Sequence, residues 1–232
     1  MNIGKRLETI GQHIPQGCVL ADIGTDHAYL PVWLLLQQKI QAAIAGDIAE
    51  GPCQAARNTV AMHGLREKVK VRCGNGLKVL HENEADCIAI AGMGGSTMIE
   101  ILAADIQLAQ KAKVLVLQPM AGAPALRRWL CANGWYIDAE DLAEEGGHLY
   151  EIIVAVRGKT PAYTDVEYEV GPCLLRSGHI LLSKQLQKLC SGYKKMLVSM
   201  EKSTRASQSD KFKQLSSLLR QLEDLNNECK CS

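Results

Sequence analysis

The stretch VLADIGTDHAYLP, residues 19–31, decides how the rest of this 232-residue chain can be interpreted. Its apolar beginning, 19–23, predicts a buried strand, and 28–38 predicts the helix that follows. Gly24 between them permits a tight turn and lets a ligand approach the backbone closely. A strand, a glycine turn and a helix in this order make up the start of a βα unit.

The same alternation of strands and helices continues as far as residue 119. Further strands are predicted at 42–47, 69–73, 87–91 and 114–117, and further helices at 52–63, 96–104 and 122–133. Continuous apolar strands that alternate with helices indicate an α/β fold whose parallel sheet is covered on both faces. The sequence then predicts two adjacent strands, 136–142 and 149–157, which indicate an antiparallel hairpin. Five parallel βα units followed by such a hairpin are the chain order of a class I, Rossmann-like methyltransferase.

The sequence after residue 158 predicts a different architecture. We expect 1–158 to form the sheet domain, and 159–232 to form a linker (159–173) and a helical hairpin. Apolar residues recur at heptad spacing on both arms of this hairpin: Leu182, Leu186, Leu189, Tyr193, Met196 and Met200, then Phe212, Leu215, Leu219 and Leu222. That spacing predicts a short antiparallel coiled coil around a polar turn. A helical lid packed on the core is the alternative.

Charge distinguishes the two halves more sharply than the total suggests. The whole chain has a net charge of +1, from 26 Lys and Arg against 25 Asp and Glu. Residues 1–158 have a net charge of −3, whereas 174–222 carry ten basic and two acidic side chains, a net charge of +8. Lysines that serve only solubility usually alternate with acids. A hairpin of this charge can contact a phosphate backbone, so we expect a nucleic-acid partner.

Composition excludes several other classes of protein. A hydrophobic content of 47% at nearly zero net charge excludes intrinsic disorder. No apolar stretch approaches the ~18 residues of a membrane span, and no apolar segment follows the first residues, so we expect a cytoplasmic protein without a membrane partner. The heptads could close within the chain or on a second chain, and we expect a monomer.

The nine cysteines give no sign of a metal or disulfide framework. No CxxC pair occurs among them, so we expect reduced, mostly buried cysteines and no metal. Cys229 and Cys231 could bind a metal ion if the tail is not simply frayed.

In a sheet of this kind, ligands bind beyond the carboxyl ends of the strands. The dinucleotide motif GxGxxG is absent, because Asp26 and Tyr29 stand where a pyrophosphate binder needs glycine. A carboxylate there repels a diphosphate but suits a sulfonium, which favours S-adenosylmethionine (SAM) over NAD. Asp47 ends the second strand, where a carboxylate can accept hydrogen bonds from two ribose hydroxyls. Asn75 offers a donor and an acceptor to an adenine edge, or forms an Asx turn.

The predicted cofactor site combines these residues with their neighbours after the first four strands. It consists of Asp22, Ile23, Gly24, Asp47, Ile48, Asn75, Gly76, Gly92 and Met93.

Three motifs of this chain, DIGTDHAYLP at 22–31, AGMGG at 91–95 and LQP at 117–119, resemble those of one family. They are similar to the bacterial tRNA (adenine-22)-N1-methyltransferases, the TrmK family, and the resemblance covers the whole chain, including the hairpin. Membership implies a SAM-dependent enzyme that methylates N1 of adenine 22 in tRNA. It also implies contacts to SAM by Asp22, Gly24, Asp47, Asn75 and Gly92. The wider class usually has an acid after the third strand, where this chain has Asn75.

The predicted catalytic residues are Asp26, His27 and Tyr29. Adenine N1 is paired in a helix, so the base must be flipped out before it reacts. Methylation leaves a positive charge shared by N1 and N6, which the carboxylate of Asp26 can stabilise. Tyr29 can stack on the base, and His27 can orient Asp26 or accept a proton. The structural alternatives are a helix N-cap for Asp26, a first-turn position for His27 and a core position for Tyr29.

Two other functions are compatible with the sequence. One is a SAM-dependent methyltransferase with another RNA or a small molecule as its substrate. The other is a non-catalytic RNA-binding protein on the same fold.

Overall fold

The computed structural model describes residues 1–231 of the chain, with side chains described as far as Cys229. The chain forms two compact units, Met1–Pro161 and Ala162–Ser232. We describe each unit by itself.

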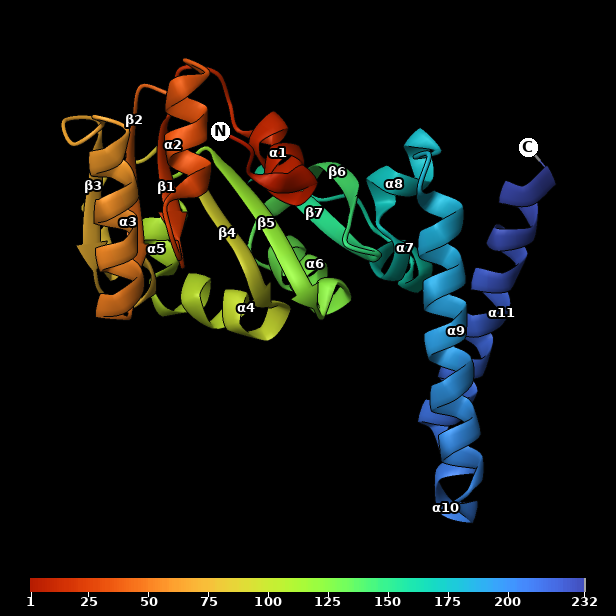
Figure 1. The fold of residues 1–232 in the computed structure, drawn as a ribbon. Helices are drawn as coiled ribbons and strands as arrows, with labels where there is room; N and C mark the ends of the chain where they lie inside the picture. Colours follow the sequence, from red (N-terminus) through yellow and green to blue (C-terminus); the bar gives the residue numbers. More distant parts are fainter. Residues whose placement is uncertain (232) are drawn as a thin grey trace. The chain divides into compact units, whose positions relative to one another are not determined.

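A seven-stranded sheet forms the centre of the first unit (Figure 1). Its strand order is β3-β2-β1-β4-β5-β7-β6. The strands are β1 (Val19–Ile23), β2 (Ala42–Asp47), β3 (Val69–Cys73), β4 (Cys87–Gly94), β5 (Val114–Ala121), β6 (Trp135–Glu145) and β7 (His148–Arg157). The first five strands pair in parallel, and β7 runs antiparallel to both β5 and β6. The predicted five parallel strands and closing hairpin are confirmed.

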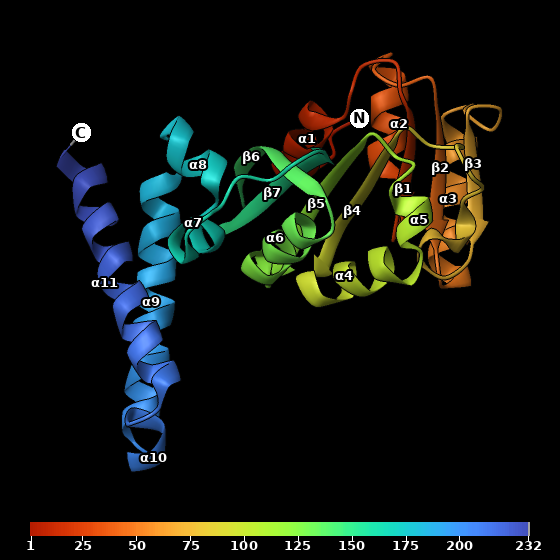
Figure 2. The same ribbon diagram turned by 180° about the vertical axis from the view of Figure 1, so that it is seen from behind.

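Helices cover both faces of this sheet (Figures 1 and 2). One face carries α1 (Gly4–His13), α2 (Tyr29–Leu36) and α3 (Glu50–Met62), and the other carries α4 (Gly95–Ala104) and α6 (Ala123–Ala132), with the short α5 (Ile106–Ala109) after α4. The strand order grows from β1 towards β3 and from β4 towards β5, in opposite directions. Right-handed crossovers in opposite directions place their helices on opposite faces. The central strands are therefore buried on both sides, as in β1, where four of five residues are buried.

The first helix is absent from the sequence-based prediction. Its apolar residues Leu7 and Ile10 and the residue that caps it, Ile14, recur at 3-4 spacing, and Ile10 and Ile14 are buried in the core. This spacing was a readable signal for an amphipathic helix. The helix matters because it carries Arg6 to the carboxyl edge of the sheet, as described below.

One expectation about the cysteines is wrong, because Cys53 and Cys73 form a disulfide. Cys53 lies in the first turns of α3 and Cys73 ends β3, and their Cα atoms are 6.1 Å apart. The crossover from β2 through α3 to β3 brings them together, which their separation of 20 residues does not reveal. Cys18, Cys87, Cys131, Cys173, Cys190 and Cys229 take no part in this disulfide.

The second unit consists of helices: α7 (Asp165–Val170), α8 (Pro172–Ser177), α9 (Leu182–Glu201), α10 (Thr204–Ser207) and α11 (Asp210–Cys231). The expected linker at 159–173 is therefore partly wrong, since α7 lies within it. Thr164 and Glu167 form a reciprocal capping box at the start of α7, which satisfies the backbone N–H groups there. Helices α9 and α11 lie side by side as a hairpin, and Lys194 pairs with Glu223 across it at 2.6 Å (Figure 2).

The apolar stripe of α9 differs from the predicted heptad. Leu182 and Leu186 are buried as expected, but Cys190 and Leu197 are buried beyond them, and the predicted Met196 is 46% exposed. A straight α-helix has 3.6 residues per turn rather than 3.5, so its buried face drifts by one position over a few turns. Among the described residues, no helix is both long enough and apolar enough to cross a membrane.

Candidate functional site

Two cavities lie at the carboxyl edge of the sheet, and Gly24 lines both of them. The first has a volume of about 410 Å³ and lies over β1, β2, β3 and β4. The second has a volume of about 440 Å³ and lies between α1 and the turn after β1. A ligand that extends past Gly24 would therefore occupy parts of both.

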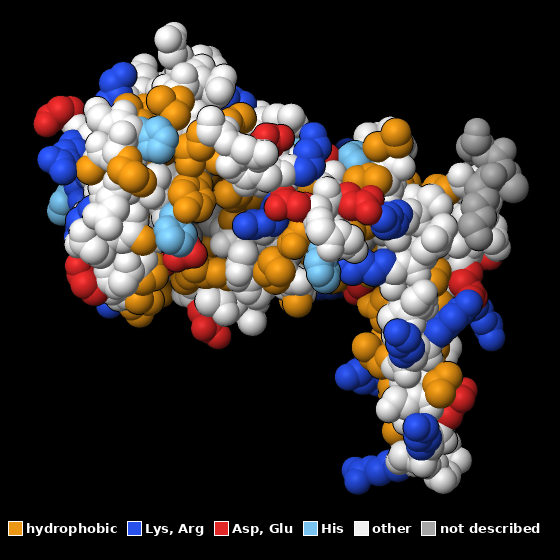
Figure 3. Space-filling view, in the orientation of Figure 1, with side chains coloured by type: hydrophobic (Ala, Val, Ile, Leu, Met, Phe, Trp, Pro, Cys, Tyr) orange, Lys and Arg blue, Asp and Glu red, His pale blue; other side chains and the backbone are white. Residues whose placement is uncertain are grey.

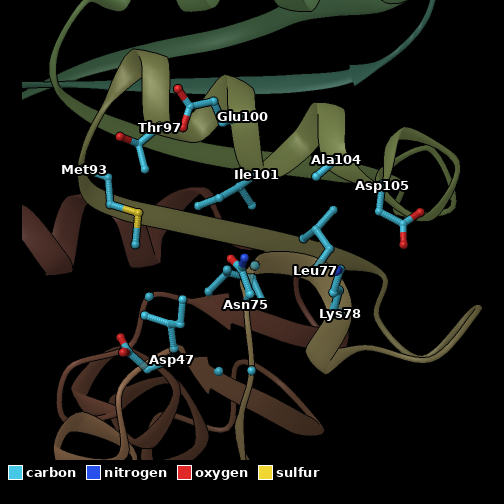
Figure 4. Close-up of a pocket in the computed structure, with 16 residues that line it drawn as sticks. Asp47, Asn75, Leu77, Lys78, Met93, Thr97, Glu100, Ile101, Ala104 and Asp105 are labelled. Carbon is cyan, nitrogen blue, oxygen red and sulfur yellow. The ribbon is translucent and has the colours of Figure 1, made fainter.

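The first cavity is lined by most of the predicted cofactor residues (Figure 4). It contains Ile23, Gly24, Asp47, Ile48, Asn75, Gly76 and Met93. Asp22 and Gly92, which were predicted with them, line the second cavity instead. Helix α4 contributes Thr97, Glu100 and Ile101, which we did not predict, because the packing of α4 decides which of its side chains face the cavity.

Asp47 is held by its own turn. Its Oδ1 accepts a hydrogen bond from the Ala49 N–H at 2.8 Å, and its backbone carbonyl accepts one from the Gly74 N–H at 2.9 Å. No hydrogen bond from a described residue reaches its Oδ2, so that oxygen can accept one from a ligand. The exposed Asn75 precedes the 3-10 turn Gly76–Val79 without a side-chain bond to it, so the Asx turn is not formed.

Gly24 is required where a ligand would approach the backbone closely, at the junction of the two cavities. Its φ of +79° lies in the left-handed region, which residues other than glycine rarely adopt. A Cβ atom at this position would also collide with the methyl group of Met93.

Asp26, His27 and Tyr29 come together in the second cavity. The His27 Nε2 is 3.4 Å from Asp26 Oδ2, and the His27 and Tyr29 rings stack at 5.0 Å between centroids with a 7° angle between planes. The Asp26 side chain is 78% exposed and Tyr29 is 42% exposed, so the core alternative for Tyr29 is wrong. The N-cap of α2 is Ala28, whose N–H donates to Thr25 Oγ1, so Asp26 is no N-cap.

Asp22 forms the floor of this cavity and is only 7% exposed. Burial raises the pKa of its carboxyl group to about 6. The hydrogen bond with Thr25 and the guanidinium of Arg6 oppose that rise, and the carboxylate of Asp47 adds to it.

Arg6 lines the second cavity and is bonded to Gln118 behind it, and neither was predicted as a site residue. Arg6 Nη1 donates to Gln118 Oε1 at 2.9 Å, and the same oxygen accepts the Gly92 N–H at 3.2 Å. Gln118 is fully buried within β5. The sequence did offer a signal for Gln118, which is an amide within an apolar strand. It offered none for the bond between Gln118 and Arg6 of the first helix.

Among residues 1–229 no group of three or more His, Cys, Asp or Glu side chains could hold a metal ion. The side chain of Cys231, half of the tail pair considered above, lies outside the described residues.

Comparisons with known proteins agree on one family. Residues 3–153 match a family model described as a methyltransferase domain. The tRNA (adenine(22)-N(1))-methyltransferase of Bacillus subtilis is 40% identical over 195 residues, which cover 82% of each chain. A Streptococcus pneumoniae protein solved in complex with SAM is 33% identical, with a TM-score of 0.86 over 97% of this chain and 100% of that one. The TrmK of M. capricolum, solved with S-adenosylhomocysteine (SAH), is 25% identical, with a TM-score of 0.81 over 98% of both chains.

Proposed function

This chain belongs to the tRNA (adenine-22)-N1-methyltransferase family, and from that premise we propose that it methylates N1 of adenine 22 in tRNA with SAM as the methyl donor. The observation that carries the proposal is the junction of the two cavities at Gly24. The first cavity contains Asp47, whose carboxylate can bind a ribose diol, and the second contains the exposed side chains of Asp26, His27 and Tyr29. The donor would occupy the first cavity and extend past Gly24 to Asp22, whose carboxylate can accept from its ammonium group. The exposed side chains of the second cavity supply the place for the acceptor.

The first cavity fits the adenosine part of SAM. The unpartnered Oδ2 of Asp47 can accept from the ribose hydroxyls, and the exposed amide of Asn75 can bond to the adenine edge. Ile101 and Leu77 provide apolar surface for the adenine ring. When bound, SAM supplies an electrophilic methyl group on a sulfonium.

The second cavity fits an extruded adenine. The stacked rings of His27 and Tyr29 offer an aromatic face on which a flipped base can stack. Asp26 then accepts from the N6 amino group and stabilises the charge that the N1 lone pair creates as it bonds to the methyl carbon. The cation is itself the product, so Asp26 need not remove a proton, and His27 holds Asp26 in place.

The helical unit fits the tRNA backbone. All ten basic side chains of 174–222 are exposed: Arg176, Lys184, Lys188, Lys194, Lys195, Lys202, Arg205, Lys211, Lys213 and Arg220. Figure 3 shows several Lys and Arg side chains on the visible face of this unit. We assign acceptor and donor binding to 1–158 and tRNA binding to 159–232, with α9 and α11 as an antiparallel coiled coil. The enzyme acts as a monomer in the cytoplasm, where its substrate is found.

A transfer assay tests this function. The full-length protein and SAM are incubated with an unmodified tRNA transcript, and nucleosides are analysed by mass spectrometry. We expect 1-methyladenosine, and none from a transcript in which adenine 22 is replaced by guanine. Methylation of that control transcript, or of another RNA only, would reassign the substrate. Tight tRNA binding without any transfer would support the non-catalytic alternative.

A further inference from the structure

The disulfide between Cys53 and Cys73 joins the two segments that supply the polar side chains of the first cavity. Cys73 ends β3, and Gly74 and Asn75, which line the cavity, follow it at once. Cys53 lies in the first turns of α3, the helix that follows Asp47 of the same cavity (Figure 4). The bond therefore ties the segment after β2 to the end of β3.

A short series of contacts connects Cys53 to the side chain of Asp47. The Cys53 N–H donates to the Ala49 carbonyl at 3.2 Å, and the Ala49 N–H donates to Asp47 Oδ1 at 2.8 Å. Cys53 Sγ also lies 3.5 Å from the Asp47 carbonyl oxygen. On the other side of the disulfide, Asp47 is the register partner of Cys73, and its carbonyl accepts the Gly74 N–H at 2.9 Å. A restraint on the two cysteines is therefore a restraint on the turn that holds Asp47.

The two cysteines differ in their access to solvent. Cys73 is exposed, whereas Cys53 is fully buried. A small molecule in solution can therefore reach the sulfur of Cys73 but not that of Cys53. Thiol–disulfide exchange needs one accessible sulfur to start and a second sulfur within reach to finish. The Cα atoms of this pair are 6.1 Å apart, within the range that a disulfide spans, so both conditions are met.

We propose that Cys53 and Cys73 form a reversible redox switch that sets the affinity of the first cavity for the methyl donor. In the oxidised state the disulfide holds the segments of Asp47 and Asn75 in place, so less entropy is lost when the donor binds. Reduction removes this covalent restraint, and the affinity falls. The proposal rests on the assignment of the first cavity to the adenosine part of SAM, made above, and needs no statement about the RNA.

The oxidant of this switch is a disulfide of low molecular weight. The Cys73 thiolate attacks one sulfur of the oxidant and forms a mixed disulfide, while the other half leaves as a thiol with the proton that Cys73 has lost. The sulfur of Cys53 then attacks Cys73 Sγ, forms the Cys53–Cys73 bond and displaces the second thiol, which takes up the proton of Cys53. The two cysteines together lose two electrons, which the oxidant gains. A dithiol reverses both steps.

The test compares SAH binding by the oxidised and the reduced full-length protein in isothermal titration calorimetry. One sample is treated with oxidised glutathione and then desalted, and the other is kept in a phosphine reductant. Alkylation and mass spectrometry verify the state of each cysteine. The oxidised protein should bind SAH about 3- to 10-fold more tightly, the range expected when a side chain is ordered in advance. Equal affinities would overturn the proposal, and so would failure of the Cys53–Cys73 bond to form.

Two variants separate this disulfide from the other cysteines. Cys73→Ser should bind SAH as the reduced wild-type protein does, with or without reductant. Cys131→Ser is the matched control, because Cys131 of α6 takes no part in the disulfide, and it should keep the full difference between the two states. A difference that persists in Cys73→Ser, or disappears in Cys131→Ser, would assign the effect to other cysteines and overturn the proposal.

The wild-type protein decides even if Cys73→Ser does not fold. An affinity difference that appears without a mapped Cys53–Cys73 bond would overturn the switch. Absence of SAH binding in both states would refute the cofactor assignment and the switch with it. Binding that responds to reduction, together with failure of methyl transfer to tRNA, would refute the proposed function and leave the switch standing.

Discussion

The sheet unit contains a buried and paired arginine, whereas the basic side chains of 174–222 in the helical unit are exposed. Arg127 is fully buried between Glu140 and Glu151, with both carboxylates at 2.6 Å. The basic side chains of residues 182–222, which span α9, α10 and the described part of α11 as far as Leu222, are all exposed. Buried charges fix geometry and stability, while exposed charges attract a polyanion without contributing much to the fold. Changes of charge in the two units should therefore have different consequences.

The largest effect is expected from Arg127→Ala. Burial alone would lower the pKa of Arg127, but the two carboxylates more than offset it, so the guanidinium stays charged. Removing it deprives the buried Glu140 and the partly buried Glu151 of the guanidinium that pairs with both. We expect a loss of about 3–5 kcal/mol in the free energy of unfolding, measured by urea denaturation. A loss below about 1 kcal/mol would mean that the sheet unit tolerates charge changes as the helical unit does.

The second prediction concerns the first cavity. Asp47→Ala should weaken SAH binding by about 100-fold, since two hydrogen bonds from the ribose to a carboxylate are lost. Calorimetry measures the change, and the melting temperature should stay close to that of wild type. Glu67→Ala, an exposed acid of the same unit, is the matched control and should bind normally. Normal binding by Asp47→Ala would remove the cofactor assignment.

The third prediction tests the helical unit with five substitutions to glutamine: Lys195, Lys202, Arg205, Lys211 and Arg220. Loss of several phosphate contacts should raise the KM for tRNA about tenfold or more and flatten its salt dependence. SAH affinity should not change, because these side chains belong to the other unit. An unchanged salt dependence would show that the tRNA is held by the sheet unit.

The fourth prediction is a pH dependence of cofactor binding. Because the pKa of Asp22 is about 6, its carboxylate is available to an ammonium group above that pH and is lost below it. SAH affinity should fall about tenfold between pH 7.5 and pH 5, and this fall should be absent in Asp22→Asn. Arg6 of α1 and Asp47 of β2 are the charged groups that face Asp22, so Arg6→Ala should shift the midpoint upward.

The raised pKa of Asp22 also has a consequence for the ligand-free protein. A carboxyl group whose pKa is higher in the folded state stabilises the fold fully below its ordinary pKa of 3.8. That contribution is lost as the pH rises through about 6. Asp22→Asn should therefore raise the melting temperature at pH 7.5 without ligand. A lower melting temperature would show that the ionised carboxylate is stabilised in the fold.

The smallest effect is expected from Lys194→Ala. The Lys194–Glu223 pair joins α9 to α11, but the Lys194 side chain is 59% exposed to solvent. Exposed ion pairs contribute little, so the melting temperature should stay nearly the same. A drop comparable to that of Arg127→Ala would contradict the contrast between the two units.

The fold of the sheet unit could be predicted closely from sequence. The first three strands have the predicted bounds, since a short apolar run that ends in glycine or an acid marks both ends of a buried strand. The helical unit was harder to predict. Its linker contains α7, and the buried stripe of α9 shifts from Met196 to Leu197, because small steps in helical phase accumulate along a long helix.

The candidate site was predictable where its residues are local in sequence. Asp26, His27 and Tyr29 lie within four positions, and the turn after β1 brings them together by itself. Thr97 and Ile101 were not predictable, because only the packing of α4 decides that they face the cavity. The assignment of Asp22 and Gly92 to the second cavity likewise depends on how β1 and β4 pair.

The order of the strands, the turn chemistry at Gly24 and the unequal division of charge between the two halves could all be derived from the sequence. These follow from the periodicity of apolar residues, from backbone sterics and from the number of charged residues in each half, none of which depends on tertiary contacts. Only the tertiary structure decided that Arg6 meets Gln118 across 112 residues, and that Cys53 meets Cys73. Such contacts depend on which elements pack together, and packing is a property of the whole fold rather than of any segment.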